Sequence, residues 1–400
     1  MSKSSRPSFD PADPLSIDAQ LSEEELAVRS SVRSMLDSKV APHVAQWFED
    51  GGLPDPRGLA KEFGAMGLLG MHLQGYGCAG MSAVAYGIAC VELEACDSGI
   101  RSMVSVQGSL AMFAIWRFGS EEHKQRWLPA MAAGDAIGCF GLTEADHGSD
   151  PAGMRTKARR DGDDWILDGS KMWITNGSIA DVAVVWAQTD EGLRGFVVPT
   201  DVPGFTARTI EHKMSLRASI TSELVFENLR LPGDAVLPDV TGLRGPLSCL
   251  SEARYGIVWG ALGAARSSLD AAIDYSKTRT QFGAPLASFQ LTQAKIADMA
   301  LELHKGMLLA LHLGRRKDDV GLRPEQVSFG KLNNVREALD ICRTARTILG
   351  ANGISLEYPV IRHMNNLESV LTYEGTSEMH TLIIGQALTG SSAFDPPARH

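Results

Sequence analysis

The stretch "WILDGSKMWITN", residues 165–176, separates a purely helical fold from a mixed one for this chain. It is rich in aromatic and β-branched residues, and its Asp168-Gly169 pair suits a type I′ hairpin turn, which needs positive φ. The nearby segments "DVAVVWAQT", "RGFVVPT", "TARTI" and "SELVFENLRL" have the same character. Because they do not alternate with helical segments, they predict an antiparallel barrel or sandwich rather than a parallel nucleotide-binding sheet.

The chain on both sides of these strands has helical patterning. Before them, "LSEEELAVRSSVRSMLDSKVAP" follows a Ser22 cap, "MSAVAYGIACVELEAC" is apolar, and "SEEHKQRWLPAMAAG" ends at Gly134. After them, "QLTQAKIADMALELHKGMLLALHLG" and "KLNNVREALDICRTARTILG" carry apolar residues every three or four positions. Long helices joined by short loops favour an antiparallel bundle.

We therefore predict an α+β fold that is mainly α. Its predicted parts are a disordered lead at 1–16, an N-terminal helical domain at 17–136, a middle antiparallel β-barrel domain at 137–245, a C-terminal four-helix bundle at 246–393 and a tail at 394–400.

Composition excludes several classes of protein. A formal net charge of −10 argues against nucleic-acid binding. No apolar run approaches the roughly 18 residues of a membrane span. The N-terminus, "MSKSSRPSFDPADPLS", resembles neither a signal peptide nor a transit peptide, so we expect a cytoplasmic protein. The six cysteines and ten histidines show no metal-binding spacing, so no metal site is predicted.

Two short motifs require a choice between readings. "GYGCAG", residues 75–80, satisfies G-x-G-x-x-G, but the segment before it reads as a helix end and loop, so we reject a dinucleotide-binding turn. "LTYEGTSEMH", residues 371–380, places Glu374 beside Gly375, which lets backbone approach a substrate closely. A buried glutamate whose pKa rises toward ~6–7 can act as a base. The local alternative is a carboxylate exposed in a turn.

The order helices, strands, helices, with its particular strings, resembles the acyl-CoA dehydrogenase family from about residue 17 to 394. The strings are "DSGIRSMVSVQGSL", "GCFGLTEADHGSDP", "KMWITN", "EARYGI", "QFGAPLASFQL", "NGIS" and "TYEGT", and they are most similar to the glutaryl-CoA branch. The resemblance implies an FAD cofactor, an acyl-CoA thioester substrate, an electron-transferring flavoprotein as partner and a homotetramer. It also implies that Glu374 is the base that removes the α-proton.

In the glutaryl-CoA branch, the resemblance implies oxidation and decarboxylation of glutaryl-CoA to crotonyl-CoA and CO2. Arg101 would hold the distal carboxylate, because a buried guanidinium needs an anion and pairs well with a planar carboxylate. The presence of both Tyr373 and Glu94 is typical of decarboxylating members. The other matching substrate-site residues are Ser102, Ser105, Ser149, Arg254 and Gly375.

Two other enzymatic functions stay open at this point. One is an oxidase that uses O2 directly, because the sequence does not show whether solvent reaches the flavin. In the other, Arg101 could form a structural salt bridge with Glu94, and the protein would then oxidise another short, branched or dicarboxylic acyl-CoA without decarboxylation. A non-catalytic scaffold of the same fold is disfavoured by the intact "TYEG" string.

The resemblance assigns the cofactor-binding residues to separate stretches of sequence. The first set, implied to contact the flavin and pyrophosphate, is Phe140, Leu142, Thr143, Gly148, Ser149, Trp173, Ile174 and Thr175. Thr376 and Glu378 follow the base and could equally cap a helix. The segment with Arg279, Gln281 and Phe282 is implied to reach the FAD of a neighbouring subunit, while Gln290 matches a contact to the adenosine half and Gly350 a close backbone approach.

Overall fold

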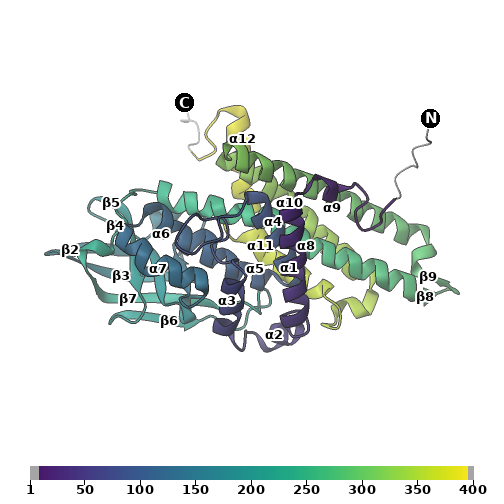
Figure 1. Ribbon diagram of the computed structural model, residues 1–400, viewed down its shortest axis with the longest axis horizontal. Coiled ribbons are helices and arrows are strands. Elements are labelled where there is room, and N and C mark those ends of the chain that lie inside the picture. The colour runs from purple at the N-terminus through teal and green to yellow at the C-terminus, as the bar shows by residue number, and fades with distance from the viewer. Residues whose placement is uncertain (1–8, 395–400) are drawn as a thin grey trace, which may run out of the picture.

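The computed structural model of the protein describes residues 9–394. A curled β-sheet occupies one end of an elongated molecule, and long helices extend from it to the other end (Figure 1). The helices before the sheet are α1 (Glu23–Lys39), α2 (Val44–Asp50), α3 (Pro56–Ala65), α4 (Ala83–Cys96), α5 (Ser98–Ser105), α6 (Phe113–Phe118) and α7 (Glu121–Ala133). The helices after it are α8 (Arg244–Thr278), α9 (Gln290–Val320), α10 (Pro324–Ile348), α11 (Val360–Thr372) and α12 (Ser377–Thr389).

The sheet contains the strands between α7 and α8, in the order β1-β4-β2-β3-β7-β6, with β5 also paired to β4. These strands are β1 (Gly138–Gly141), β2 (Lys157–Asp161), β3 (Asp164–Thr175), β4 (Val182–Thr189), β5 (Gly192–Pro199), β6 (Phe205–Thr209) and β7 (Thr221–Leu231). The predicted order of helices, sheet and helices is therefore confirmed. The sheet is mixed rather than wholly antiparallel, because β1 and β2 each pair with β4 in parallel.

The predicted hairpin turn at Asp168-Gly169 is wrong. Strand β3 continues through both residues and pairs with β7 on either side of an irregularity between Leu167 and Gly169. The turn lies earlier, at 162–163, between paired residues Asp161 and Asp164. Gly169 is at a bulge instead, where its positive φ of 141° and its closeness to Thr156 leave no room for a side chain.

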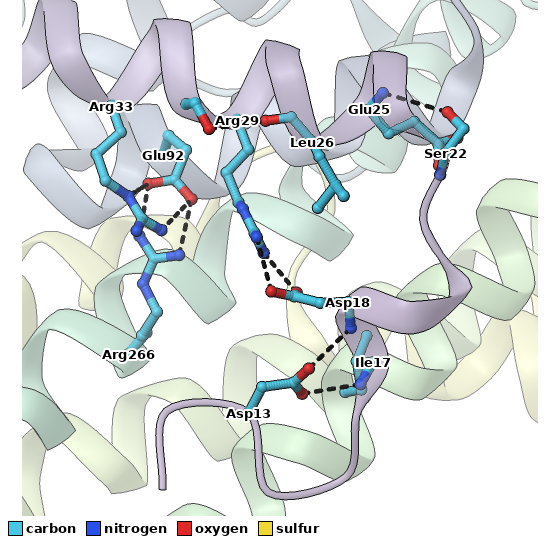
Figure 2. Close-up of polar contacts among 11 residues, drawn as sticks. Asp13, Ile17, Asp18, Ser22, Glu25, Leu26, Arg29, Arg33, Glu92 and Arg266 are labelled. Carbon is cyan, nitrogen blue, oxygen red and sulfur yellow. Dashed lines mark hydrogen bonds and ion pairs between the residues drawn. The ribbon is translucent and has the colours of Figure 1, made fainter. Parts of the chain in front are cut away.

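The described part of the predicted disordered lead, residues 9–16, forms turns that lead into the short 3-10 helix Ile17–Gln20. The Asp13 carboxylate accepts hydrogen bonds from the backbone N–H groups of Ile17 and Asp18, at 2.8 and 2.9 Å (Figure 2). The Asp18 side chain in turn accepts two hydrogen bonds from Arg29 on α1. Residues 1–8 of the predicted lead and residues 395–400 of the predicted tail lie outside the described residues, so disorder of the lead stays a prediction.

Helices from both ends of the sequence share one apolar core. Glu92 on α4 lies between Arg33 of α1 and Arg266 of α8 and accepts two hydrogen bonds from each (Figure 2). Around this contact α4 packs on α8, and α10 packs on α8, α9, α11 and α12. The predicted four-helix bundle is therefore joined by a fifth helix, α12. A second, separate core fills the curled sheet.

Helix α5 is linked to the sheet through its own continuation. α5, a π-helical turn at Val106–Met112 and α6 follow one another without a break. From this turn the Gln107 side chain donates to the carbonyls of Met131 and Ala136, and accepts from Gly138 N–H at 2.7 Å. The start of β1 is thus held against the helix that carries Arg101.

Residues 75–80 lie in a loop with turns between α3 and α4, and the described residues just before them contain no strand. This agrees with our rejection of a dinucleotide-binding turn at this motif. Over residues 9–394, no helix has the length and apolar character needed to cross a bilayer. The same residues contain no group of three His, Cys, Asp or Glu side chains that could hold a metal ion.

Candidate active site

The loop between α11 and α12 carries the candidate base. Glu374 has φ 53° and Gly375 has φ 99°, so two successive residues occupy the left-handed region. A side chain at position 375 would place its Cβ 2.9 Å from Nε2 of the buried His380, which explains the glycine. Left-handed backbone at a non-glycine residue costs about 1–3 kcal/mol and is often found at functional sites.

Cationic side chains hold the three successive carbonyls of this loop. Arg254 on α8 donates from Nε to the Glu374 carbonyl at 2.6 Å. Lys331 on α10 donates from Nζ to the carbonyls of Tyr373 and Gly375, at 2.5 and 2.6 Å. The conformation of Glu374 is therefore set by helices distant in sequence rather than by the loop itself.

Arg101 lies next to this loop and is fully buried on α5. Its Nε donates to Glu94 Oε2 on α4 at 2.7 Å, and its Nη2 donates to the Tyr373 hydroxyl. The salt bridge with Glu94 that the sequence left open is thus present. Arg101, Glu94, Tyr373 and Glu374, together with the residues that contact this loop, form one buried polar cluster.

Several side-chain atoms of the cluster have no hydrogen-bond partner within the part of the chain that the structure describes. They are Arg101 Nη1, Glu94 Oε1, Glu374 Oε2 and His380 Nε2. Ser105 Oγ, buried one turn after Arg101 on α5, also has none among the described residues. Buried polar atoms are almost always hydrogen-bonded, because an unpaired one costs about 1–3 kcal/mol. A group of such atoms around one carboxyl is typical of a site built to receive a polar ligand.

The surroundings of Glu374 favour a base whose affinity for protons is increased. Burial raises the pKa of the Glu374 carboxyl, while the charges of Arg101, Lys331 and Arg254 oppose that rise. Burial raises the pKa of the Tyr373 hydroxyl as well, so this group stays protonated at neutral pH. The loop therefore combines a carboxyl of raised pKa with a neutral phenol and nearby cations.

The start of α5 is fixed by a buried aspartate. Asp97 accepts from Gly99 N–H at 2.6 Å and so caps the helix that carries Arg101. Its other oxygen accepts from Arg362 and Asn366 of α11, at 2.7 and 2.8 Å. Because α11 leads into the Glu374 loop, this contact couples the position of Arg101 to that of the candidate base. Ser102 is buried on the same helix, next to Arg101.

The first group of predicted cofactor residues gathers where the segment after β1 meets the end of β3. Met172 N–H donates to the Thr143 carbonyl at 2.8 Å, which brings the segments 140–143 and 173–175 side by side. Trp173 has φ 64°, lies within an irregularity of β3 between Lys171 and Ile174, and leaves 58% of its surface exposed. The remaining members divide by burial: Phe140, Leu142 and Ile174 are buried, Thr143 and Thr175 are half-buried, and Gly148 and Ser149 are exposed in a loop.

The second group lies at the opposite end of the molecule, where Figure 1 shows the hairpin of β8 (Thr280–Gln281) and β9 (Ala284–Pro285). Phe282 at its tip is 97% exposed. Asn352 donates to the Tyr275 hydroxyl at 3.1 Å and so holds the turn at Gly350 near this end of α8. The exposed members of the group are Arg279, Gln281, Phe282, Gln290 and Gly350. A single chain therefore does not bring the two groups of predicted cofactor residues together.

Thr376 and Glu378 have the capping roles that the sequence left open. The Thr376 side chain accepts from Met379 N–H at 3.3 Å and caps α12. Glu378 is exposed in the first turn, and hydrogen bonds, chiefly from its own backbone, lower the pKa of its carboxyl. These contacts do not compete with binding of a ligand by the same loop.

Two buried lysines near the site were not predicted from the sequence. Lys331 lies four residues after Val327 and four before Val335, so it interrupts the apolar face of α10. Lys171 on β3 donates to the Leu142 carbonyl at 3.1 Å and to Glu144 Oε1 at 2.8 Å, beneath the first cofactor group. A charged residue on an otherwise apolar face was the available signal in the case of Lys331.

Known proteins can now be compared with this fold and site. Family models for the N-terminal, middle and C-terminal domains of acyl-CoA dehydrogenases match residues 22–135, 139–229 and 241–389. The chain is 36% identical over 379 residues to the short-chain specific acyl-CoA dehydrogenase of Bos taurus mitochondria, covering 93% of this chain and 92% of that protein.

Two solved structures are more similar. A glutaryl-CoA dehydrogenase from Mycobacterium smegmatis is 70% identical with a TM-score of 0.95, covering 96% of this chain and 99% of its own. Another from the same organism, in complex with FADH2, is 64% identical with a TM-score of 0.95, covering 97% and 100%. With all three domain models matched in order over nearly the whole sequence, the chain belongs to the acyl-CoA dehydrogenase family.

Proposed function

We propose that the protein catalyses FAD-dependent oxidation and decarboxylation of glutaryl-CoA to crotonyl-CoA and CO2. The observation that carries this proposal is the fully buried Arg101, whose Nη1 has no partner within residues 9–394 and which shares a cluster with Glu374. A second carboxylate on the substrate is the anion that this guanidinium can bind. The similarity to glutaryl-CoA dehydrogenases supports the same choice.

The residues present fit a flavin cofactor. The half-exposed Trp173 indole lies near the end of β3, beside the Thr143 segment, as suits a planar ring that would stack there. The exposed group around Arg279 and Phe282 would complete the site from a second copy of the chain, which supports the homotetramer implied by the resemblance. FAD, when bound, would accept the hydride that leaves the β-carbon.

Glu374 would remove the α-proton. The Cα–H bond breaks, the proton passes to the Glu374 carboxylate, and the electron pair is delocalised onto the thioester carbonyl. The Glu374 N–H would donate to that carbonyl oxygen, where negative charge develops. Burial that raises the pKa of Glu374 makes this carboxylate a stronger base for the step.

Arg101 would hold the distal carboxylate during both stages. After oxidation, the bond between the γ-carbon and this carboxylate breaks, CO2 leaves, and the electron pair is delocalised toward the thioester. Protonated Glu374 then returns its proton to the γ-carbon, which gives crotonyl-CoA. The neutral Tyr373 hydroxyl and Glu94 would keep the guanidinium in place.

The Arg101–Glu94 salt bridge also favours a second candidate. Because Glu94 already balances the charge of Arg101, the guanidinium has a structural role without any substrate carboxylate. The protein would then oxidise another short, branched or dicarboxylic acyl-CoA without decarboxylation. Under either function we propose an electron-transferring flavoprotein as the acceptor and a cytoplasmic location.

The test compares thioesters on the purified, flavin-loaded protein without oxygen. We expect glutaryl-CoA to bleach the flavin absorbance, and glutaryl-CoA labelled with 13C in its distal carboxylate to release labelled CO2 and leave crotonyl-CoA. Bleaching by butyryl-CoA but not by glutaryl-CoA would establish the second candidate. An unsaturated dicarboxylic thioester formed without CO2 would do so as well.

A further inference from the structure

Lys331 is a buried charge without an assigned role. It lies on α10 with 2% of its surface exposed, and its two recorded hydrogen bonds go to backbone carbonyls rather than to a carboxylate. Burying an ammonium group is costly unless it is paired and hydrogen-bonded, so a buried lysine without a carboxylate partner indicates a role for its charge. A methionine of similar length would fill the same space at less cost. The position of the two carbonyls indicates what requires the charge.

The two carbonyls belong to Tyr373 and Gly375, the residues on either side of Glu374. Glu374 itself has φ 53°, a conformation that persists only where its surroundings hold it. Arg254 holds the carbonyl of Glu374, whereas Lys331 bridges the carbonyls of the residues before and after it. One ammonium group therefore closes the loop around the candidate base.

We propose that Lys331 is a positioning residue for Glu374: its ammonium group clamps the carbonyls on both sides and so aims the carboxylate at the α-carbon of the bound thioester. This inference rests on the proposed role of Glu374 as the base. It adds a residue that acts through Glu374 without touching the substrate.

The charge of Lys331 has a second consequence, because it is linked to that of Glu374. Burial lowers the pKa of the Lys331 ammonium, and the nearby charge of Glu374 opposes this shift. Glu374 acts as a base in its charged carboxylate form, which the positive charge of Lys331 stabilises. Removing the charge of Lys331 therefore raises the pKa of Glu374 further. The other charged or titratable side chains that face the pair are Glu94 of α4, Arg101 of α5, Arg254 of α8, Tyr373 after α11 and His380 of α12.

Two substitutions separate the clamp from the charge. Lys331→Met removes both the charge and the donors at nearly constant volume. Lys331→Gln removes the charge and keeps a shorter amide donor. Lys213→Met is the matched control, because Lys213 also donates to two backbone carbonyls, those of Leu216 and Ser219, in a loop before β7. All variants are purified with flavin, and rates are expressed per bound flavin.

The first readout is proton exchange, which does not depend on flavin oxidation. In the pre-reduced protein in D2O, the Cα–H bond of butyryl-CoA breaks, Glu374 takes the proton, and a deuteron returns to the same carbon. Mass spectrometry measures this exchange. We expect Lys331→Met to slow it roughly 100-fold, as expected for a displaced base, while the Kd of the thioester changes less than about threefold.

The second readout is the pH dependence of flavin bleaching at saturating thioester. We expect the acid limb to move to higher pH in both Lys331 variants, and Lys331→Gln to keep part of the exchange rate. Lys213→Met should match the parent in both measurements. If Lys331→Met does not fold, Lys331→Gln tests the proposal: an acid limb at higher pH than in the parent supports it, and an unmoved acid limb overturns it.

The proposal is overturned if Lys331→Met exchanges protons within about threefold of the parent rate, or if the acid limb is unmoved. It is overturned as well if only the Kd of the thioester rises, because the lysine would then serve binding. Failure of the proposed function is distinguishable: a parent protein that exchanges no α-protons, or a Glu374→Gln variant that exchanges them normally, contradicts the assignment of the base.

Discussion

Replacing Arg101 by methionine tests how the protein would select its substrate. The change removes a guanidinium that is fully buried and bonded to Glu94 and Tyr373. If Nη1 binds the distal carboxylate of glutaryl-CoA, the variant loses a charge pair at about 4 Å, worth up to about 4 kcal/mol at an effective dielectric of ~20. Truncating one partner of such a buried pair costs about 2–5 kcal/mol.

This free energy corresponds to a fall in kcat/KM for glutaryl-CoA of roughly 30-fold or more. Butyryl-CoA has no distal carboxylate, so its kcat/KM should hold or rise. The measured quantity is the ratio of the two constants, which cancels any general loss of folding or flavin binding. Steady-state assays with an artificial electron acceptor give both constants on one preparation.

The single variant also leaves Glu94 buried without its cation, which costs about 3–5 kcal/mol of stability. Arg101→Met combined with Glu94→Gln removes this second effect and is the matched control. Its ratio of constants should equal that of the single variant, while its free energy of unfolding should be closer to the parent's. If both thioesters fall by the same factor in both variants, Arg101 is structural and the second candidate function replaces the first.

Three further outcomes are expected. The purified protein should be yellow, with one non-covalent FAD per chain released by acid; a colourless protein that gains no flavin absorbance with added FAD would contradict the cofactor assignment. Glu374→Gln should bind acyl-CoA normally but fail to bleach the flavin, and bleaching at a near-normal rate would point to another base. Although burial alone raises it, pairing with Arg266 and Arg33 lowers the pKa of Glu92 from 4.5 to about 2. This carboxylate therefore adds about 3 kcal/mol to the free energy of unfolding above pH ~4.5, lost as pH falls toward 2. In denaturant titrations, Glu92→Gln should have a lower free energy of unfolding than the parent at neutral pH, and this free energy should fall less steeply as pH drops from about 4.5 toward 2. If it falls equally steeply in variant and parent, the Glu92 carboxylate does not contribute to the acid dependence of stability.

Much of the fold followed from local patterns. The Ser22 cap, the stop at Gly134 and the apolar spacing of the long helices are short-range signals, and the structure confirms each of them. The predicted hairpin turn at Asp168-Gly169 was wrong, because the path of a strand depends on its pairing with the partner strand. Strand β3 pairs with β7 along nearly its whole length, and a bulge at Gly169 accommodates the irregular backbone there. The long-range pairing therefore outweighed the local preference of Asp168-Gly169 for a turn.

The site divides in the same way. The sequence alone indicated Glu374, Arg101, Glu94 and Tyr373, because their strings resemble those of one family. It contained no indication that three cationic contacts would hold successive carbonyls of the Glu374 loop. Those contacts join residues 42 to 120 positions apart in the sequence. The separate contact between the Arg101 side chain and the Tyr373 hydroxyl joins residues 272 positions apart. Periodicity predicts which face of a helix is buried, but only the path of the whole chain decides which buried charges meet, because their partners come from other helices.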